Sequence, residues 1–552
     1  MTGSLDADVI IAGGGPCGLM LANELGRRGV RALLLTEKTS TSDFPQANAT
    51  QARTMEHYRR LGFASTVRAL GLPPDYPTDV TYWTRFSKHE LARYRLPASG
   101  EAGELVKTLT GSWSAAELPH RCSQMYVERV LREAADKLPA VKLQFGWRVT
   151  GFQDLGARVE VEAAPVAGGA KRRFTGSYLV GCDGPRSEIR KALGVRFSGE
   201  SGAAREYMGG PQHAIYFRSR ALYAHIAGPK AWQYITVNRE RRGLVIPLDG
   251  NDSFVFHAQL RPEEEKAEIG ETKARAMFAE ALGEECTMSI IDRRSWTAGY
   301  TLVAEKFGQG RVLLGGDAVH LFTPTGGLGY NTAVEDAVNL GWKLAATLKG
   351  WGGAGLLASY ETERMPVARR NTGFARRFAD SVGLYQVPEN LEEESAAGAA
   401  ARRAAGEYFL GHARAEFDIP GVTFGARYDG SPVIAPDGAP PPPDEPNVYV
   451  PSTVPGGRAP HLWLGGGRSL YDQLGFEFTL LRLGPKAPDG AALARAAETR
   501  GVPLAVLGVA GEEARDLYQA DLALIRPDQI VAWRGNRLPA DCGALLAAVT
   551  GH

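Results

Sequence analysis

The stretch from Ala7 to Lys38 constrains the possible fold more than any other part of the sequence. A buried strand over 8–12 precedes a glycine-rich turn and an apolar helix, and a second strand over 31–36 ends at Glu37. The turn reads GGGPCG and fits the pattern G-x-G-x-x-G. In this pattern the first glycine makes a tight turn, the second admits a pyrophosphate close to the backbone, and the third lets helix and strand pack closely. The stretch therefore predicts a βαβ unit that binds a dinucleotide, FAD or NAD, rather than an ordinary βα turn.

We expect the dinucleotide to contact both the turn and the end of the second strand. The expected contacts in the turn are Gly13, Gly15, Pro16 and Gly18. Glu37 can accept hydrogen bonds from ribose hydroxyls. Lys38 is expected to contact the phosphates of a nicotinamide dinucleotide, NADH or NADPH.

Two later segments show the same order of buried strand, polar loop and helix. Tyr178–Val180 is followed by GCDGPRS, where an Asp–Gly pair often makes only a turn and a helix cap. Val312–Leu314 is followed by GGDAVHLFTPTGGLGYN, and apolar residues at helical spacing then predict a helix over 331–349. Amide groups at the start of such a helix favour an anion, or a negative charge that develops during a reaction.

Together the three motifs resemble those of the group A flavoprotein monooxygenases, the aromatic hydroxylases related to p-hydroxybenzoate hydroxylase and phenol hydroxylase. The resemblance implies an α/β chain with a Rossmann-like FAD-binding domain, an interleaved antiparallel-sheet substrate domain and a thioredoxin-like C-terminal α/β domain. It implies FAD as cofactor and NADH or NADPH and O₂ as co-substrates. The reaction would be hydroxylation of a phenolic ring through a flavin C4a-hydroperoxide.

The resemblance also implies roles for single residues around FAD. Asp183 and Arg190 would serve FAD and shape the path of NAD(P)H, Asp317 would bind the ribityl chain, and Gln124 would contact the flavin. The helix N-terminus would face the flavin N1–C2=O edge and stabilise the anionic reduced form. The contacts expected there are Gly327, Leu328, Gly329 and Asn331.

Substrate contacts are expected from the segment between the second and third motifs, where alternating apolar residues predict an antiparallel sheet. Trp232, Tyr234 and Thr236 should share one strand face, with Trp232 packing on a ring and Tyr234 bonding a phenol. The alternative is that these aromatic residues belong to the core. Pro324, which is rigid and lacks an N–H, is expected beside the reactive edge of the flavin.

No catalytic base is evident from the motifs. Relatives place an arginine where Gln46 stands, and some place a histidine where Asn48 stands. Neither side chain is a base at neutral pH, so we expect both only as substrate contacts. His320 could lie at the flavin, but a structural hydrogen bond is the more common role of such a histidine.

The resemblance, together with a proline-rich stretch, implies that the chain has five parts. The expected parts are a FAD-binding domain over 1–80, 115–190 and 300–380, a substrate-binding sheet domain over 81–114 and 191–299, a helical segment over 381–430, a proline-rich linker over 431–457 and a thioredoxin-like domain over 458–552. The last part contains no CxxC, so we expect it to stabilise the protein or support a homodimer rather than to carry dithiol chemistry.

The overall composition argues against several other classes of protein. A formal net charge of +1 gives no reason to expect a nucleic-acid partner, and no apolar run is long enough to suggest a membrane partner. No secretory leader is evident, and five scattered cysteines suggest neither disulfides nor a metal site. The sequence therefore predicts a cytoplasmic enzyme, and the resemblance implies that its substrate is a small phenolic molecule.

The leading hypothesis is a FAD-dependent monooxygenase in aromatic catabolism. Two alternatives stay open: a tailoring hydroxylase of an aromatic polyketide, and a FAD-binding protein that does not hydroxylate.

Overall fold

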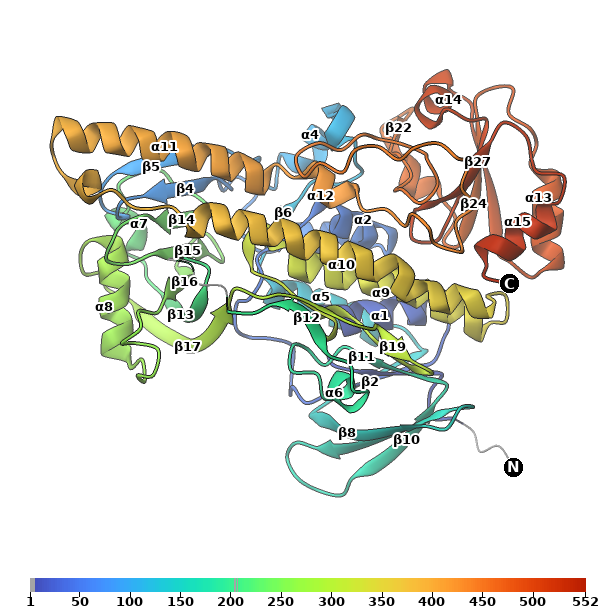
Figure 1. Cartoon of the computed structure of the whole chain (residues 1–552), viewed down its shortest axis with the longest axis horizontal. Helices are drawn as coiled ribbons and strands as arrows, with labels where there is room; N and C mark the ends of the chain where they lie inside the picture. The colour runs from blue at the N-terminus through green and yellow to red at the C-terminus, as the bar shows by residue number, and fades with distance from the viewer. Residues whose placement is uncertain (1–4, 203–204, 206) are drawn as a thin grey trace.

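A six-stranded sheet forms the centre of the molecule (Figure 1). The computed structural model describes residues 5–202, 205 and 207–552. The strand order is β19 (Gly308–Gln309), β20 (Val312–Leu314), β11 (Tyr178–Gly181), β1 (Val9–Ala12), β2 (Ala32–Thr36) and β7 (Val141–Phe145). All neighbours are parallel except β19 and β20. The expected strands before all three motifs are confirmed.

Helix α1 (Pro16–Arg27) packs on β1, β2 and β7, and both α5 (Gln124–Asp136) and α9 (Leu328–Leu348) pack against α1. β1 and β2 are buried along their whole length, because both α1 and a three-stranded sheet over residues 147–176 pack against them. The expectation that the third helix begins at Asn331 is wrong, because α9 already begins at Leu328. Gly326 and Gly327 adopt φ values of 67° and 65°, so the loop ends in two left-handed residues and the helix starts directly after them.

A seven-stranded sheet forms the second layer. Its order is β17 (Ser289–Ala298), β13 (Gly210–Arg218), β16 (Ser253–Gln259), β15 (Gly243–Pro247), β14 (Gln233–Thr236), β4 (Val80–Trp83) and β5 (Glu90–Tyr94). The predicted antiparallel sheet is confirmed for the strands between 210 and 259, although β14 lies parallel to β4. One face packs against α8 (Glu271–Leu282), while α10 (Ala354–Gly383) and α11 (Ala396–Phe417) pack on the other.

The C-terminal part is a separate α/β layer, as predicted. Its sheet has the order β25 (Leu504–Val509), β24 (Phe478–Leu483), β26 (Leu522–Ile525) and β27 (Val531–Gly535), with only β24 and β25 parallel. The helices are α13 (Ala491–Thr499), α14 (Glu512–Tyr518), which was not predicted, and α15 (Cys542–Val549). This layer, red in Figure 1, packs against the C-terminal half of α9, where the rings of Trp342 and Phe478 are in contact. Residues 431–457, the predicted linker, contain no helix or strand.

Smaller elements complete the chain. They are β3 (Ala49–Thr50), α2 (Ala52–Arg60), α3 (Ala64–Arg68), α4 (Ala102–Thr108), β6 (His120–Arg121), β8 (Trp147–Asp154), β9 (Val159–Pro165), β10 (Arg172–Gly176), α6 (Glu188–Ala192), β12 (Phe197–Glu200), α7 (Leu222–His225), β18 (Thr301–Ala304), β21 (His320–Leu321), α12 (Pro420–Phe424), β22 (Trp463–Leu464) and β23 (Arg468–Ser469). Within the described residues, no helix combines the length and apolar character needed to span a bilayer.

Candidate active site

The three motif loops meet at one edge of the central sheet, because β1, β11 and β20 are parallel neighbours and each loop leaves a carboxyl end. Gly13 has φ +115°, and a Cβ there would lie 2.1 Å from the Cys182 carbonyl oxygen. A Cβ on Gly18 would lie 2.0 Å from the Gly13 oxygen. At Gly15, by contrast, no atom of the described residues comes within 4 Å of the Cβ position. The turn is therefore closed at its first and third glycines and open at its second, where a pyrophosphate would approach.

Among the described residues, no side chain caps the N-terminus of α1 or of α9, and neither helix has an acidic residue in its first turn. The first N–H groups of a helix have no partner within the helix, so an uncapped end attracts an anion. Gly327 and Gly329 at the start of α9 are partly exposed, and Pro324 in the preceding loop is exposed.

Asp317 lies on the loop between these two helix ends. It is exposed, yet the protein around it raises the pKa of its carboxyl, an effect that His320 opposes and Asp336 reinforces. The exposed Asp317 carboxylate can therefore meet a ligand, which suits the predicted contact with a ribityl chain.

Three buried carboxylates, one from each of three helices, hold loops that carry predicted site residues. Glu128 on α5 accepts from the Ser42 N–H (2.8 Å). Asp336 on α9 accepts from the Gly316 N–H (3.1 Å), and Glu416 on α11 from the Gly326 N–H (2.8 Å). Hydrogen bonds to ionised acceptors are stronger than neutral ones, so each carboxylate fixes its loop firmly. None of these anchors was predicted, because each lies far along the chain from the loop it holds.

The remaining motif residues differ in how freely they could meet a ligand. Glu37 follows β2 and pairs with Arg148 (2.7 Å) at the surface, while the Lys38 ammonium lies 3.6 Å from Glu128. Gln124 donates to Gln46 (3.1 Å), so the structure brings these two predicted residues together, and Asn48 is half-buried nearby on the same loop.

Asn331 and His320 have structural partners. The Asn331 side chain accepts from the Gln51 N–H and donates to the Ala49 and Gly327 carbonyls, so only its backbone is free for a cofactor. The fully buried His320 lies 2.7 Å from Asp336, which agrees with the structural role considered for it.

A hydrogen bond connects the second motif, around Asp183, to the third motif, around Asp317. Asp183 Oδ2 accepts from the Glu188 and Ile189 N–H groups, whereas its buried Oδ1 has no partner among the described residues. Arg190 is buried, stacks on Phe197 and donates to the Ala318 carbonyl (3.3 Å). Arg190 therefore points toward the Asp317 loop, while Asp183 keeps an acceptor free.

The expectation that Trp232, Tyr234 and Thr236 share one face is wrong. Trp232 precedes the first residue of β14 and packs with Arg121 and Phe417 on the face of α10 and α11. Tyr234 is fully buried on the opposite face, which α8 covers, and its hydroxyl accepts from the Ala231 N–H. Thr236 donates to the Arg241 carbonyl. Tyr234 and Thr236 are therefore buried core residues of the sheet. Trp232 does not share their face, because β14 and its alternation of side chains begin only at Gln233.

These residues fit FAD. The open position at Gly15, the two uncapped helix ends, the free Asp183 oxygen and the exposed Asp317 lie on three loops that leave neighbouring strands. No group of His, Cys, Asp and Glu side chains in the described part of the chain could hold a metal ion.

Comparisons with known proteins agree with this geometry. The family model "FAD binding domain" matches residues 6–375, and "Aromatic-ring hydroxylase, C-terminal" matches residues 452–552. The chain is 30% identical to the FAD-dependent monooxygenase apdD of Emericella nidulans, over 98% of this chain and 90% of that protein. It is 32% identical to aklavinone 12-hydroxylase DnrF of Streptomyces peucetius (88% and 92% covered) and 27% identical to a phenol 2-monooxygenase of Pseudomonas sp. (98% and 91%).

Solved structures give the same result. The rebeccamycin biosynthetic enzyme RebC with reduced flavin superposes with a TM-score of 0.86 at 32% identity, covering 99% of both chains. A ternary complex of aklavinone-11 hydroxylase with FAD and aklavinone superposes with a TM-score of 0.81 at 26% identity, covering 100% of both chains.

Proposed function

Because the chain belongs to the family of FAD-dependent aromatic-ring hydroxylases, we propose that it hydroxylates a polycyclic phenolic molecule, with NAD(P)H as reductant and O₂ as oxidant. The observation that carries the flavin chemistry is the uncapped N-terminus of α9, whose loop a buried carboxylate holds in place. Support for a polycyclic substrate comes from similarity over most of the chain to aklavinone hydroxylases and to a rebeccamycin biosynthetic enzyme, because aklavinone and rebeccamycin are polycyclic aromatic compounds.

The residues of this chain would bind and orient the cofactor. In this proposal the α1 N-terminus and Gly15 receive the pyrophosphate, Glu37 the adenosine ribose, and Asp317 the ribityl chain. The amides of Leu328 and Gly329 stabilise negative charge on the reduced ring. Bound flavin supplies the electrons and activates the oxygen that is transferred.

The substrate would lie between the flavin and the sheet face that α10 and α11 share. Gln46 and Asn48 border this region from the loop that Glu128 holds, and Pro324 borders it from the loop before α9. Because Gln46 and Asn48 cannot take a proton, they would orient the substrate rather than deprotonate it.

A second candidate is a phenol hydroxylase of aromatic catabolism, which the similarity to phenol 2-monooxygenase favours. One experiment separates the candidates. The purified protein is given NADH or NADPH with two sets of compounds, and cofactor oxidation is scored against oxygen incorporation by mass. The first set contains anthraquinone-type and indolocarbazole polycycles, and the second contains phenol, resorcinol, hydroxyphenylpropionate and hydroxybiphenyl.

We expect the polycyclic set to accelerate NAD(P)H oxidation and to yield a hydroxylated product. Turnover of the single-ring phenols alone would support the catabolic role. Oxidation that no compound accelerates would refute hydroxylation and leave the non-hydroxylating FAD protein.

A further inference from the structure

A buried ionic network joins the C-terminal layer to α10. Arg526, in the turn between β26 and β27, donates two hydrogen bonds to Glu363 of α10 (2.7 and 2.9 Å). Asp528 accepts from the same guanidinium (3.0 and 2.6 Å). These three side chains are at most 2% exposed, so none of them can exchange its partner for water.

Glu363 has no accepting capacity left for water. Lys343, Asn339 and Ser431 also donate to it, at 2.6, 2.7 and 2.7 Å. A buried charge is tolerated only when it is fully compensated, so loss of one donor disturbs the whole set.

The next residue of α10 continues the network toward the flavin site. Arg364 is fully buried and donates to Asp336 Oδ1 of α9 (2.7 Å). The other oxygen of Asp336 accepts from the Gly316 N–H (3.1 Å) and contacts His320 (2.7 Å). Gly316 precedes Asp317, so Glu363, Arg364 and Asp336 connect Arg526 to the loop that bears the predicted ribityl contact.

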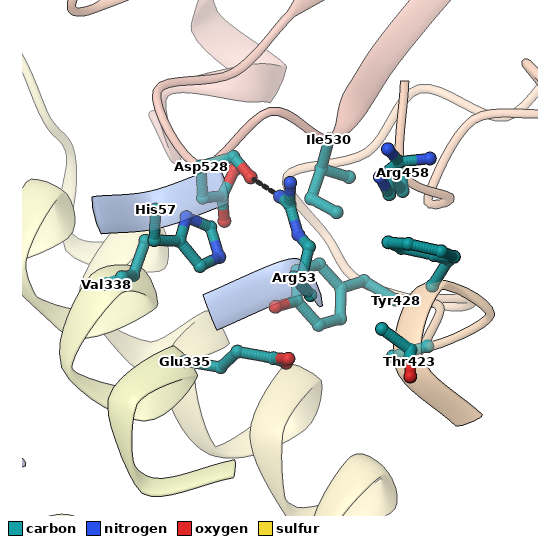
Figure 2. Close-up of a pocket in the computed structure, with 11 residues that line it drawn as sticks. Arg53, His57, Glu335, Val338, Thr423, Tyr428, Arg458, Asp528 and Ile530 are labelled. Atoms are coloured by element: carbon teal, nitrogen blue, oxygen red, sulfur yellow. Dashed lines mark hydrogen bonds between the residues drawn. The ribbon is translucent and has the colours of Figure 1, made fainter. Parts of the chain in front are cut away.

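A second set of contacts orients the Arg526 turn. Arg53 of α2 donates to the Asp528 carbonyl and to the Gln529 side chain, both at 2.7 Å. Figure 2 shows Arg53, Asp528 and Arg458 around a small cavity of about 20 Å³ at this junction. The free volume suits a single water molecule. The buried His57 Nδ1 and Thr423 Oγ1 that border it have no partner among the described residues. This part of the junction is thus polar and directional, unlike the apolar contact of Trp342 with Phe478.

We propose that Arg526 is a positioning residue for the FAD site: by holding Glu363 it keeps Arg364 and Asp336 in the geometry that fixes Gly316, and with it Asp317. The C-terminal layer is then part of the cofactor site although none of its residues need touch FAD. This inference rests on the proposed FAD site, and the test below separates the two.

The test measures FAD affinity by titrating apoprotein while following flavin fluorescence and the visible absorption of bound flavin. Arg526→Met removes the charge and keeps the length of the side chain. Arg534→Met is the matched control, because Arg534 lies in the adjoining strand and pairs with Asp437 (2.6 Å), outside the network. We expect Arg526→Met to raise the Kd of FAD about tenfold and to alter the flavin absorption bands, with Arg534→Met within about twofold of the unmodified protein.

Arg526→Lys keeps the charge but not the two-pronged contact, so its Kd should fall between the other two. If the methionine variants do not fold, the FAD affinity of Arg526→Lys is compared with that of Arg534→Lys instead, and this comparison tests the inference. Equal FAD affinity and spectra in the unmodified and Arg526 variants would overturn the inference while leaving the proposed function intact, as would equal weakening by the Arg534 variants. Failure of the unmodified protein to bind FAD would refute the proposed function itself.

Discussion

Gly15 and Gly18 lie in the same turn, yet a methyl group would meet opposite surroundings at the two positions. Gly15 has an extended backbone, with φ −87° and ψ −174°, and open space in front of it. Gly18 faces the Gly13 oxygen at 2.0 Å from the Cβ position. We therefore expect Gly15→Ala to leave the thermal stability of the apoprotein unchanged and to raise the Kd of FAD about tenfold or more, because the methyl group occupies the pyrophosphate position.

Gly18→Ala should act differently, lowering the free energy of unfolding of the apoprotein by about 1–3 kcal/mol through overpacking. Thermal unfolding and FAD titration of both variants distinguish the two effects. A stable Gly18→Ala protein, or normal FAD affinity in Gly15→Ala, would contradict this account of the turn.

His120 gives the folded protein a specific sensitivity to acid. Its side chain is 1% exposed, and burial together with the nearby Arg68 lowers the pKa of its imidazole to about 4. The imidazole of His120 in the unfolded chain has a pKa of about 6.5. Between these values the unfolded state binds a proton that the folded state excludes, so stability falls as the pH falls through this window.

From pH 7 to pH 5 the contribution of His120 to this loss is about 2 kcal/mol. Urea unfolding of the His120→Gln variant should show a correspondingly smaller difference between the two pH values. Glutamine is the suitable replacement because it can still donate to the Leu70 carbonyl that His120 contacts at 3.0 Å. An unchanged pH dependence in the variant would assign the acid sensitivity to other groups.

At the scale of elements, the start of α9 depends on a contact from elsewhere in the chain. Glu416 of α11 accepts from the Gly326 N–H at 2.8 Å, and Gly326 precedes the N-cap of α9. Without this acceptor the loop is less fixed, and the amides of α9 are less well aligned to stabilise reduced flavin. We expect Glu416→Ala to lower the flavin midpoint potential by about 30 mV, which for two electrons corresponds to about 1.4 kcal/mol.

A spectroelectrochemical titration of the FAD-loaded protein measures this shift. Glu416→Gln keeps an acceptor oxygen and should lower the potential less. A potential that is the same in the alanine variant and the unmodified protein would show that the carboxylate does not act on the flavin through this loop.

The local sequence pattern was sufficient to predict the strands and helices at the three motifs, because each strand–turn–helix unit consists of consecutive residues. It was insufficient where the chain begins an element in an unusual way. α9 starts earlier than apolar spacing indicated, since Gly326 and Gly327 form a left-handed corner before it. Trp232 lies on the other face from Tyr234, since the residue before a strand does not follow the strand's alternation.

At the scale of the whole molecule, the buried charges could not be predicted from the sequence. Charged residues such as Glu363 and Arg364 on a long helix are normally solvated. Here both are at most 1% exposed, and the partner Arg526 lies 163 residues beyond Glu363. Such pairs follow no spacing rule, because only the packing of the C-terminal layer on α9 and α10 brings them together.

The same packing determines how the molecule should unfold. Trp342 and Trp351 on the FAD-binding side share one hydrophobic cluster with Phe478, Leu480 and other residues of the C-terminal layer. Separating the two parts would expose this cluster and leave Glu363 without Arg526, which is costly for a buried charge. We therefore expect calorimetry of the apoprotein to give one transition, with a calorimetric enthalpy close to the van't Hoff enthalpy.

Arg526→Met should lower the temperature of that single transition or split it into two, because it removes the ionic part of the junction and leaves the apolar part. Arg534→Met, which leaves the junction intact, is the control. Two well-separated transitions in the unmodified protein would mean that the C-terminal layer folds independently, and that its contacts with α9 and α10 are too weak to couple it to the cofactor site.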